Sequence, residues 1–325
     1  MKKIIILVIS IFIALTPGIS VLGYTVENLK LPKEGDIVLG PGKIEILADP
    51  GEEFTRELLI TNRTGADRLI RIEVEDFRGT KDPQRTVEFV GPDEENPFSL
   101  RNYVHPDIKE IILSHGQRLR LPVKIIIPEN AEPGGLYGAV MISSTEPTKP
   151  GSAVEKEKAK GKIKVITRLA TLIFVRVKGE VKEEGRLTEF KVDKRFYEKG
   201  PISFALLYEN TGNVHLDPYG VIEIKNIFGK KVGEIQLDPW FAMPDSVRLK
   251  KVKWEKGFLC GRYSAVAKIN RGYKDIIDEK TVSFWVIPWK IIVPGFIVLI
   301  AVIWLIIWIA THFEIRKKSE KKEIE

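Results

Sequence analysis

Residues 117–127 read QRLRLPVKIII, and the alternation in this stretch decides the fold class. Every second residue from Leu119 to Ile127 is a branched apolar residue, whereas Arg118, Arg120 and Lys124 occupy positions between them. A period of two places successive side chains on opposite faces of a strand, so that one face is buried and the other meets water. The stretch therefore predicts a half-buried β-strand.

The same period recurs along the chain between residues 24 and 287. Further alternating runs occupy residues 70–74, 169–177, 202–208, 263–269 and 282–286. Glycine, proline and asparagine turns separate the runs, and this region shows no convincing 3.6-residue apolar stripe. Many short strands joined by regular turns predict an all-β fold of antiparallel sandwiches.

An internal echo indicates two copies of one architecture. LLITNRTG at residues 58–65 recurs as LLYENTG at 206–212, and GLYGAV at 135–140 recurs as GRYSAV at 261–266. Each copy has a strand that ends in an Asn/Gly turn and a late strand entered through Gly-x-Tyr, whose ring can cover the edge of the core. We predict two tandem immunoglobulin-like β-sandwich domains. The predicted bounds are 24–180 for the first, membrane-distal domain and 181–287 for the second.

The first 23 residues have the pattern of a secretory signal peptide. Lys2 and Lys3 precede an apolar run over residues 4–15, and Pro17-Gly18 follows it. We expect cleavage before Tyr24, the alternative being an uncleaved anchor.

The second apolar segment, near the C-terminus, predicts a transmembrane helix at residues 288–311. Residues 291–310 carry no charge, and 20 residues at about 1.5 Å each span the hydrocarbon layer of about 30 Å. The basic cluster at 316–322 places the tail of residues 312–325 in the cytoplasm by the positive-inside rule. A buried core helix is the alternative. The sequence thus predicts a single-pass protein of the cell membrane with an exported N-terminal ectodomain.

Composition excludes several function classes. The 325 residues include 29% charged and 44% hydrophobic residues, which is ordinary for a folded chain, and the net charge of +7 is spread along the sequence. We therefore expect no nucleic-acid partner. The lone cysteine, Cys260, cannot form an internal disulfide or a multi-cysteine metal site.

Catalytic, cofactor and metal sites are not predicted. The four histidines are isolated from one another and from other ligand types at metal-binding spacing. Cys260 could be a thiol nucleophile with Arg262 nearby, but no histidine motif accompanies it, and a structural role is favoured. We predict that the protein is not an enzyme and needs no cofactor.

Trp240 and Phe241 are the candidate partner contacts. They lie in DPWFAMP at residues 238–244, where large apolar side chains crowd between prolines. One interpretation is an exposed aromatic anchor for a partner. The other, which the sequence favours, is that the two rings close the end of the second sandwich.

Several turn motifs together carry a family resemblance. DPGE at residues 49–52, Asn62, LSHGQ at 113–117 and PGGLY at 133–137 form one pattern, and residues 254–266 followed by Phe284-Trp285 form a second. The pattern resembles the WxL-interacting surface proteins of bacteria, which have two immunoglobulin-like domains. Pilus-assembly chaperones share some of these turns. The resemblance implies binding at the cell surface to a wall-associated protein or to peptidoglycan, and it transfers no contact residue.

The expected function is therefore non-covalent recognition. We predict a membrane-anchored surface binding or adhesion protein that recognises another envelope component, with the lipid bilayer as a second partner through the C-terminal helix. The alternative is a chaperone-like assembly factor for secreted surface subunits. The edges of a sandwich permit strand addition by a partner in either case.

Overall fold

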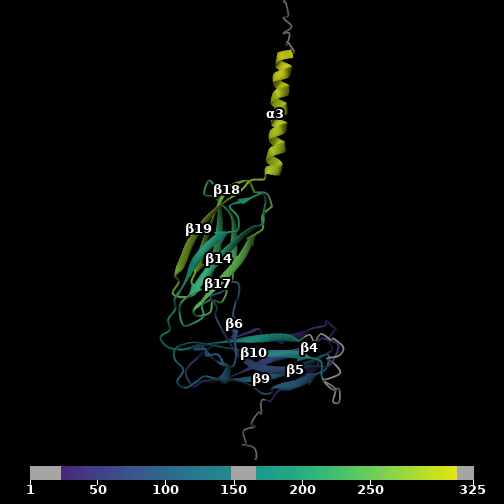
Figure 1. The fold of residues 1–325 in the computed structure, drawn as a ribbon, viewed down its shortest axis with the longest axis vertical. Coiled ribbons are helices and arrows are strands. Elements are labelled where there is room, and N and C mark those ends of the chain that lie inside the picture. The colour runs from purple at the N-terminus through teal and green to yellow at the C-terminus, as the bar shows by residue number, and fades with distance from the viewer. Residues whose placement is uncertain (1–22, 148–165, 258, 313–325) are drawn as a thin grey trace, which may run out of the picture. The chain divides into compact units, whose positions relative to one another are not determined.

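A computed structural model of the chain describes residues 23–147, 166–257 and 259–312. The predicted signal peptide and basic tail lie almost entirely outside the described residues. The described chain separates into two compact units (Figure 1). Apart from the gaps just given, the first contains residues 23–80, 87–182 and 212–214, and the second contains residues 81–86, 183–211 and 215–312.

The first unit is a sandwich of two sheets. One sheet has the strand order β1, β9, β4, β2, with β7 also paired to β9, and the other has the order β3, β11, β10, β5, β6, with β8 paired to β5. The strands of the first sheet are β1 (Thr25–Asn28), β2 (Ile37–Gly40), β4 (Glu53–Asn62), β7 (Val104–Pro106) and β9 (Gln117–Ile126). Those of the second are β3 (Lys43–Ala48), β5 (Arg68–Arg78), β6 (Glu88–Val90), β8 (Glu110–Leu113), β10 (Gly134–Thr145) and β11 (Thr167–Val177). A short 3₁₀ helix, η1, occupies Arg101–Tyr103.

β9 is buried on one face only, as the alternation in its sequence predicts. Leu119, Leu121, Val123 and Ile125 are all 0% exposed and lie in the hydrophobic core of the first sandwich. On the opposite face, the guanidinium of Arg120 contacts a carboxylate oxygen of Glu57 in β4 at 2.7 Å. Burial of branched side chains on one face only is what fixes the register of such a strand.

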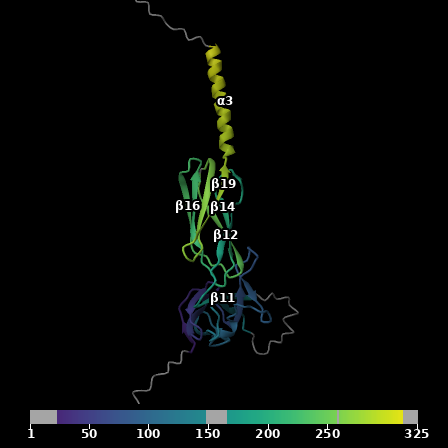
Figure 2. The same cartoon turned by 90° about the vertical axis from the view of Figure 1, so that its left-hand side faces the viewer.

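The second unit has a three-stranded sheet of order β12, β14, β17 and a five-stranded sheet of order β13, β19, β18, β15, β16 (Figures 1 and 2). The strands of the smaller sheet are β12 (Gly185–Val192), β14 (Ile202–Asn210) and β17 (Ser246–Trp254). Those of the larger are β13 (Phe196–Tyr197), β15 (Tyr219–Asn226), β16 (Lys231–Leu237), β18 (Gly261–Asn270) and β19 (Ile277–Val286).

Both halves of the sequence echo have the same structural role in the two units. Asn62 and Asn210 are each fully buried at the end of a strand, and each donates from Nδ2 to a backbone carbonyl, of Leu113 at 2.7 Å and of Ala242 at 2.9 Å. The late tyrosines, Tyr137 and Tyr263, are also buried. Tyr137 packs against Phe77 and Phe174, with ring centroids 5.8 and 5.6 Å away. Tyr263 stacks on Phe284 at 5.7 Å. The prediction that these rings cover the core is confirmed.

After β19 the chain forms the helix α3 (Trp289–His312). The most apolar 18-residue stretch within Trp289–Thr311 has a mean hydropathy of 2.9, and none of that stretch is buried. Pro294 is the sixth residue of the helix, past its first turn, so its missing N–H leaves one intrahelical hydrogen bond unmade. By length and composition α3 is able to cross a membrane. The predicted fold class of two tandem immunoglobulin-like sandwiches followed by one C-terminal helix is confirmed, and the crossing of a membrane by this helix stays a prediction.

Candidate partner-binding edge

One edge of the first sandwich is formed by a chain segment that passes from one sheet to the other. β2 pairs with residues 59–62 of β4 in one sheet, and after Pro41 and Gly42 the chain continues as β3, which runs parallel to β11 in the other sheet. The backbone N–H of Leu172 donates to the Gly42 carbonyl at 3.0 Å, and the Thr171 hydroxyl donates to the Pro41 carbonyl at 2.7 Å. Proline and glycine break an extended edge strand at this point, because one lacks an N–H and the other is conformationally free.

The crossing leaves β11 only partly covered. β10 pairs with β11 over its whole length, whereas β3 pairs only with Leu172–Val177. Among the described residues, no strand pairs with the outer side of Thr167–Thr171. We call this five-residue stretch the β11 notch. β3 lies in line with it, so an added strand here would complete the sheet.

Backbone groups in the β11 notch are oriented for such pairing. The N–H of Leu172 points toward β3, since it donates to Gly42. Backbone groups alternate in direction along a strand, which places the N–H and C=O groups of Arg168 and Ala170 on the same outer side. In the described part of the chain these four groups have no backbone partner. Unpaired strand groups of this kind are a template for an incoming extended segment.

Apolar side chains line the same end of the sandwich. Leu169 of β11 and Leu39 of β2 are both partly buried and pack against the core. The register places Leu169 opposite Ile142 of β10 and Leu39 opposite Ile60 of β4, so both face the space between the sheets. An added strand could therefore cover remaining apolar surface as well as form main-chain hydrogen bonds.

Two other unpaired edges carry more charged side chains than the β11 notch, and such charges oppose strand addition. Residues 53–58 of β4 also lack an outer partner among the described strands, but Glu53 pairs with Lys124 and Arg56 lies over the Phe54 ring at 5.4 Å. The free side of β17 bears exposed Lys251 and Lys253. Charged residues, lysine above all, are a common means of blocking edge pairing. The β11 notch has one charged side chain, Arg168, which is paired with Glu75 at 2.6 Å.

Trp240 and Phe241, the predicted contact pair, differ in burial. Trp240 is only 6% exposed and packs edge-on against Tyr208, as the interpretation of a closed sandwich end requires. Phe241 is partly exposed and lies under the Arg248 guanidinium at 5.5 Å. Burial leaves Trp240 little surface for a partner. Contact through this pair stays a prediction, and it lies in the other unit from the β11 notch.

Cys260 is exposed in the loop before β18. Its backbone N–H donates to the Tyr263 hydroxyl at 3.2 Å, and that hydroxyl donates to the Cys260 carbonyl at 3.2 Å. The residue thus belongs to a turn, and it does not share a regular strand face with Arg262 because β18 begins at Gly261. The predicted absence of catalytic, cofactor and metal sites stays a prediction.

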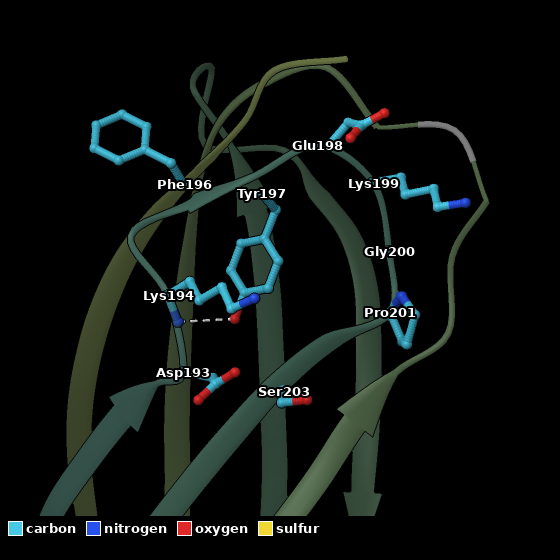
Figure 3. A pocket seen from close by; sticks show the side chains of 9 residues that line it. All are labelled: Asp193, Lys194, Phe196, Tyr197, Glu198, Lys199, Gly200, Pro201 and Ser203. Atoms are coloured by element: carbon cyan, nitrogen blue, oxygen red, sulfur yellow. Dashed lines mark hydrogen bonds between the residues drawn. The ribbon is translucent and has the colours of Figure 1, made fainter. Parts of the chain in front are cut away.

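A pocket of about 350 Å³ lies in the second sandwich beside β13. Figure 3 shows Tyr197 pointing into it and Phe196 pointing away. The Tyr197 hydroxyl accepts a hydrogen bond from the backbone N–H of Lys194 at 3.0 Å. Burial raises the pKa of the Tyr197 phenol. With Lys194, Lys199, Asp193 and Glu198 around it, the pocket lacks an arrangement of groups suited to a reaction.

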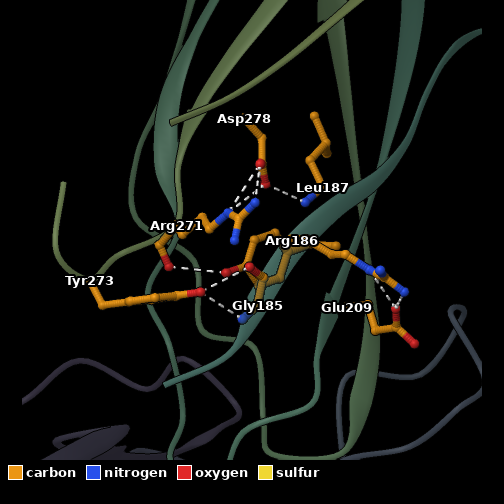
Figure 4. A network of polar contacts seen from close by, with 8 residues as sticks. Gly185, Arg186, Leu187, Glu209, Arg271, Tyr273 and Asp278 are labelled. Atoms are coloured by element: carbon orange, nitrogen blue, oxygen red, sulfur yellow. Dashed lines mark hydrogen bonds and ion pairs between the residues drawn. The ribbon is translucent and has the colours of Figure 1, made fainter. Parts of the chain in front are cut away.

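A polar network joins the two sheets of the second sandwich at its other end (Figure 4). Arg271 pairs with Asp278 at 2.6 Å, and the same carboxylate accepts from the Leu187 N–H at 2.7 Å. Hydrogen bonding to Asp278 raises the pKa of the Arg271 guanidinium. The buried Tyr208 hydroxyl donates to the Arg271 carbonyl at 3.0 Å, and burial raises the pKa of this phenol. Every group has a partner, which indicates a structural role.

Sequence reasoning missed the β11 notch. The alternation predicted a strand at 169–177. It shows which face of the strand is buried, but it does not show which of the two strand edges lacks a hydrogen-bonded neighbour. A usable signal was present in IVLGPGKIEILA at residues 37–48, where Pro41-Gly42 divides one extended run into two. Such a break is typical of an edge strand that passes from one sheet to the other.

The sequence matches no family model and no curated protein. Among solved structures, the chain is similar to fimbrial chaperones. For the class 5 fimbriae chaperone CfaA, identity is 12% and the TM-score is 0.37, over 78% of this chain and 100% of that one. For a chain of the Salmonella enterica SafA pilin–SafB chaperone complex, the values are 13% and 0.34, over 79% and 100%. For the E. coli chaperone DraB they are 13% and 0.33, over 77% and 96%.

Each of these TM-scores lies below 0.5, and the similarity therefore carries no inference about what this chain binds. The resemblance of the turn motifs to WxL-interacting surface proteins stays a prediction. The β11 notch and α3 are the two features from which we infer a function.

Proposed function

We propose that this chain is a membrane-anchored binding protein whose first sandwich receives an extended segment of an exported protein at the β11 notch. The notch itself carries the proposal. It offers two N–H and two C=O groups from Arg168 and Ala170 on an outer side that no described strand covers. Main-chain pairing would supply affinity, and the partly buried Leu39 and Leu169 would select apolar residues at alternate positions of the added strand.

Anchoring belongs to the same proposal. The exposed apolar surface of α3 has no protein cover among the described residues, and a bilayer is the environment that makes such a helix stable. With the signal peptide predicted at 1–23 and basic residues after α3, we place both sandwiches outside the membrane and residues 312–325 in the cytoplasm.

Two biological roles fit an extended-strand partner. A surface protein that presents a strand permanently would give lasting attachment, which is the predicted binding or adhesion role. A secreted subunit that awaits assembly would present its strand only for a time, which is the predicted chaperone-like role. The roles differ in when the partner is bound.

A proline substitution tests the notch directly. Ala170→Pro removes an outward N–H without removing a hydrogen bond to β10, and proline is tolerated at sheet edges for this reason. Ala170→Val keeps the N–H and is the matched control. In cells, a photo-crosslinking residue at Arg168 should capture one partner in the native and Ala170→Val chains, and this product should be lost with Ala170→Pro.

The crosslinking position needs its own control, which β17 provides. A photo-crosslinker at Lys251, on the lysine-bearing free edge, should capture nothing in common with the product at Arg168. Equal capture by the Ala170→Pro and Ala170→Val chains would contradict strand addition at the notch. A crosslinked partner found in mature envelopes supports lasting attachment, whereas one found only on newly secreted chains supports the assembly role.

A further inference from the structure

One end of the second sandwich lies next to α3 along the chain. In the sheet register, Asn226 of β15 is opposite Tyr263 of β18, which is opposite Phe284 of β19. Residues 227–230, which connect β15 to β16, therefore project beyond the strands on the same side as the end of β19. Only Ile287 and Pro288 separate β19 from Trp289, the first residue of α3. We call this side the helix-proximal end.

Chain length keeps the helix-proximal end near the membrane. Three Cα–Cα steps of about 3.8 Å reach at most about 11 Å, whatever the angle between strand and helix. The headgroup layer on one side of a bilayer is about 5–8 Å thick, and a tryptophan such as Trp289 typically lies within it. Once α3 spans the bilayer, this end of the sandwich is close to the lipid headgroups.

The β15–β16 turn presents a large apolar residue at this end. Asn226 Oδ1 accepts from the backbone N–H groups of Phe228 and Lys230, both at 3.0 Å. Gly229 takes a positive φ of 75°, which lets the turn close. The turn is thus well defined by its own hydrogen bonds. Phe228 at its tip is 89% exposed and Ile227 is 65% exposed, so neither packs into the sandwich.

More exposed apolar side chains occur at the same end of the sheet, on β13 and β19 near its opposite edge. Phe196 of β13 is 64% exposed and is paired in register with Trp285 of β19, which is 41% exposed. Figure 3 shows Phe196 turned away from the interior while its neighbour Tyr197 points inward. Single exposed apolar residues are common. A phenylalanine almost fully in water on a turn closed by its own hydrogen bonds, at the same end of the sheet as further exposed apolar side chains, indicates an interaction surface.

Basic residues accompany this apolar set. The stretches 193–201, 227–231 and 255–257 lie at the helix-proximal end and contain six Lys and Arg residues against three Asp and Glu residues. Lys194, Arg195, Lys199 and Lys230 form no ion pair with a carboxylate of the described chain. Aromatic residues beside unpaired cations match the headgroup layer of a bilayer, where aromatic rings enter the interface and lysines meet anionic lipids.

We infer that the helix-proximal end of the second sandwich docks on the membrane surface, with Phe228 inserted among the headgroups and the surrounding basic residues bound to anionic lipid. This inference rests on the proposed anchoring by α3. Docking adds a second point of attachment, so the second sandwich is held against the bilayer and does not swing freely on α3.

Depth measurements on the full-length chain test the docking. In a Cys260→Ser background, Phe228→Cys receives an environment-sensitive fluorophore, and Lys274→Cys is the control. Lys274 lies in the β18–β19 turn at the other end of the same strands, which are about 30 Å long at 3.4 Å per residue. The chain is reconstituted into phosphatidylcholine vesicles with and without phosphatidylglycerol, both containing a lipid with a nitroxide headgroup.

We expect strong nitroxide quenching at position 228 and little at position 274. Quenching at 228 should increase with phosphatidylglycerol, and it should fall with added salt and with Lys230→Glu/Lys231→Glu. Equal quenching at 228 and 274, or none at 228, would overturn the docking. Absence of quenching at 228 is also the result expected if Phe228 contacts a protein partner and not lipid.

Flotation separates this inference from the anchoring. Flotation of the chain with vesicles after alkaline carbonate treatment reports insertion of α3. Flotation without quenching at 228 overturns the docking and leaves the proposed function standing. Loss of flotation overturns the anchoring and, with it, the docking that depends on it.

Discussion

Buried asparagines are the residues that most clearly tie the sequence to the fold. Asn62 donates to the carbonyl groups of Leu113 and Ala66 and accepts from the backbone N–H of Thr64 at 2.9 Å. One side chain thus joins the end of β4, the following turn and β8. Its counterpart Asn210 lies in the second sandwich, so the two residues offer matched tests of the two cores.

Asn62→Ala should destabilise the first sandwich. Removing the amide leaves the buried Leu113 carbonyl without this donor, which typically costs about 1–3 kcal/mol. Hydrogen exchange of the full chain should then be faster by about 5- to 150-fold in β4 and β9, since 1.4 kcal/mol is a factor of ten. Asn210→Ala should accelerate exchange in β14 and β17 instead. The same pattern of exchange in both variants would show that the two asparagines do not support separate cores.

Because the Tyr208 phenol is buried, we expect the second sandwich to lose stability at alkaline pH. Burial raises the pKa of its phenol above the ordinary value of 10.0, so the folded state keeps the phenol neutral. Above pH 10 the unfolded chain releases this proton and the folded chain retains it. The contribution of Tyr208 is therefore complete below pH 10 and declines as pH rises further.

A Tyr208→Phe variant isolates this effect. At neutral pH it should be less stable by about 1 kcal/mol, because the hydrogen bond to the Arg271 carbonyl is lost. The difference in unfolding free energy between the two chains should shrink above pH 10, as measured by urea unfolding across that range. A difference that stays constant with pH would contradict the assignment.

Among the elements, β17 shows how an exposed edge is kept from pairing. Lys251 and Lys253 are exposed on a strand that pairs only with β14 in the described chain. Replacing both with threonine raises strand propensity and removes the charge. We expect the Lys251→Thr/Lys253→Thr chain to form concentration-dependent oligomers in detergent solution. The Lys251→Arg/Lys253→Arg chain keeps the charge, and in sedimentation experiments it should have the same oligomeric state as the native chain. Similar sedimentation of the threonine and arginine variants would show that lysine does not protect this edge.

Much of this element structure could be predicted from the sequence, because alternation records burial on one face. The runs at 70–74, 117–127 and 202–208 became β5, β9 and β14 for that reason. Alternation could not predict which strand edges lack a hydrogen-bonded neighbour. Which side of β11 lacks a partner depends on where β2 and β3 pair, and these contacts join residues far apart in sequence. The exposure of Phe228 likewise follows from the β15–β16 turn, which apolar periodicity does not describe.

At the scale of the whole molecule, we propose that α3 anchors two exported sandwiches. The sequence predicts a signal peptide at one end and a membrane-spanning helix with a basic tail at the other. The structure has an exposed apolar helix that is joined to the second sandwich through two residues. A segment of an exported protein can reach the β11 notch only if the sandwiches lie outside the membrane. Topology is therefore what the account depends on most.

Cysteine accessibility in intact cells measures this topology most directly. In a Cys260→Ser background, Lys274→Cys places a thiol in the second sandwich, and Ser319→Cys places one in the basic tail. A membrane-impermeant thiol reagent applied to cells stripped of any outer layer should label position 274 fully and position 319 only after lysis. Labelling of position 319 in intact cells, with position 274 protected until lysis, would contradict the account.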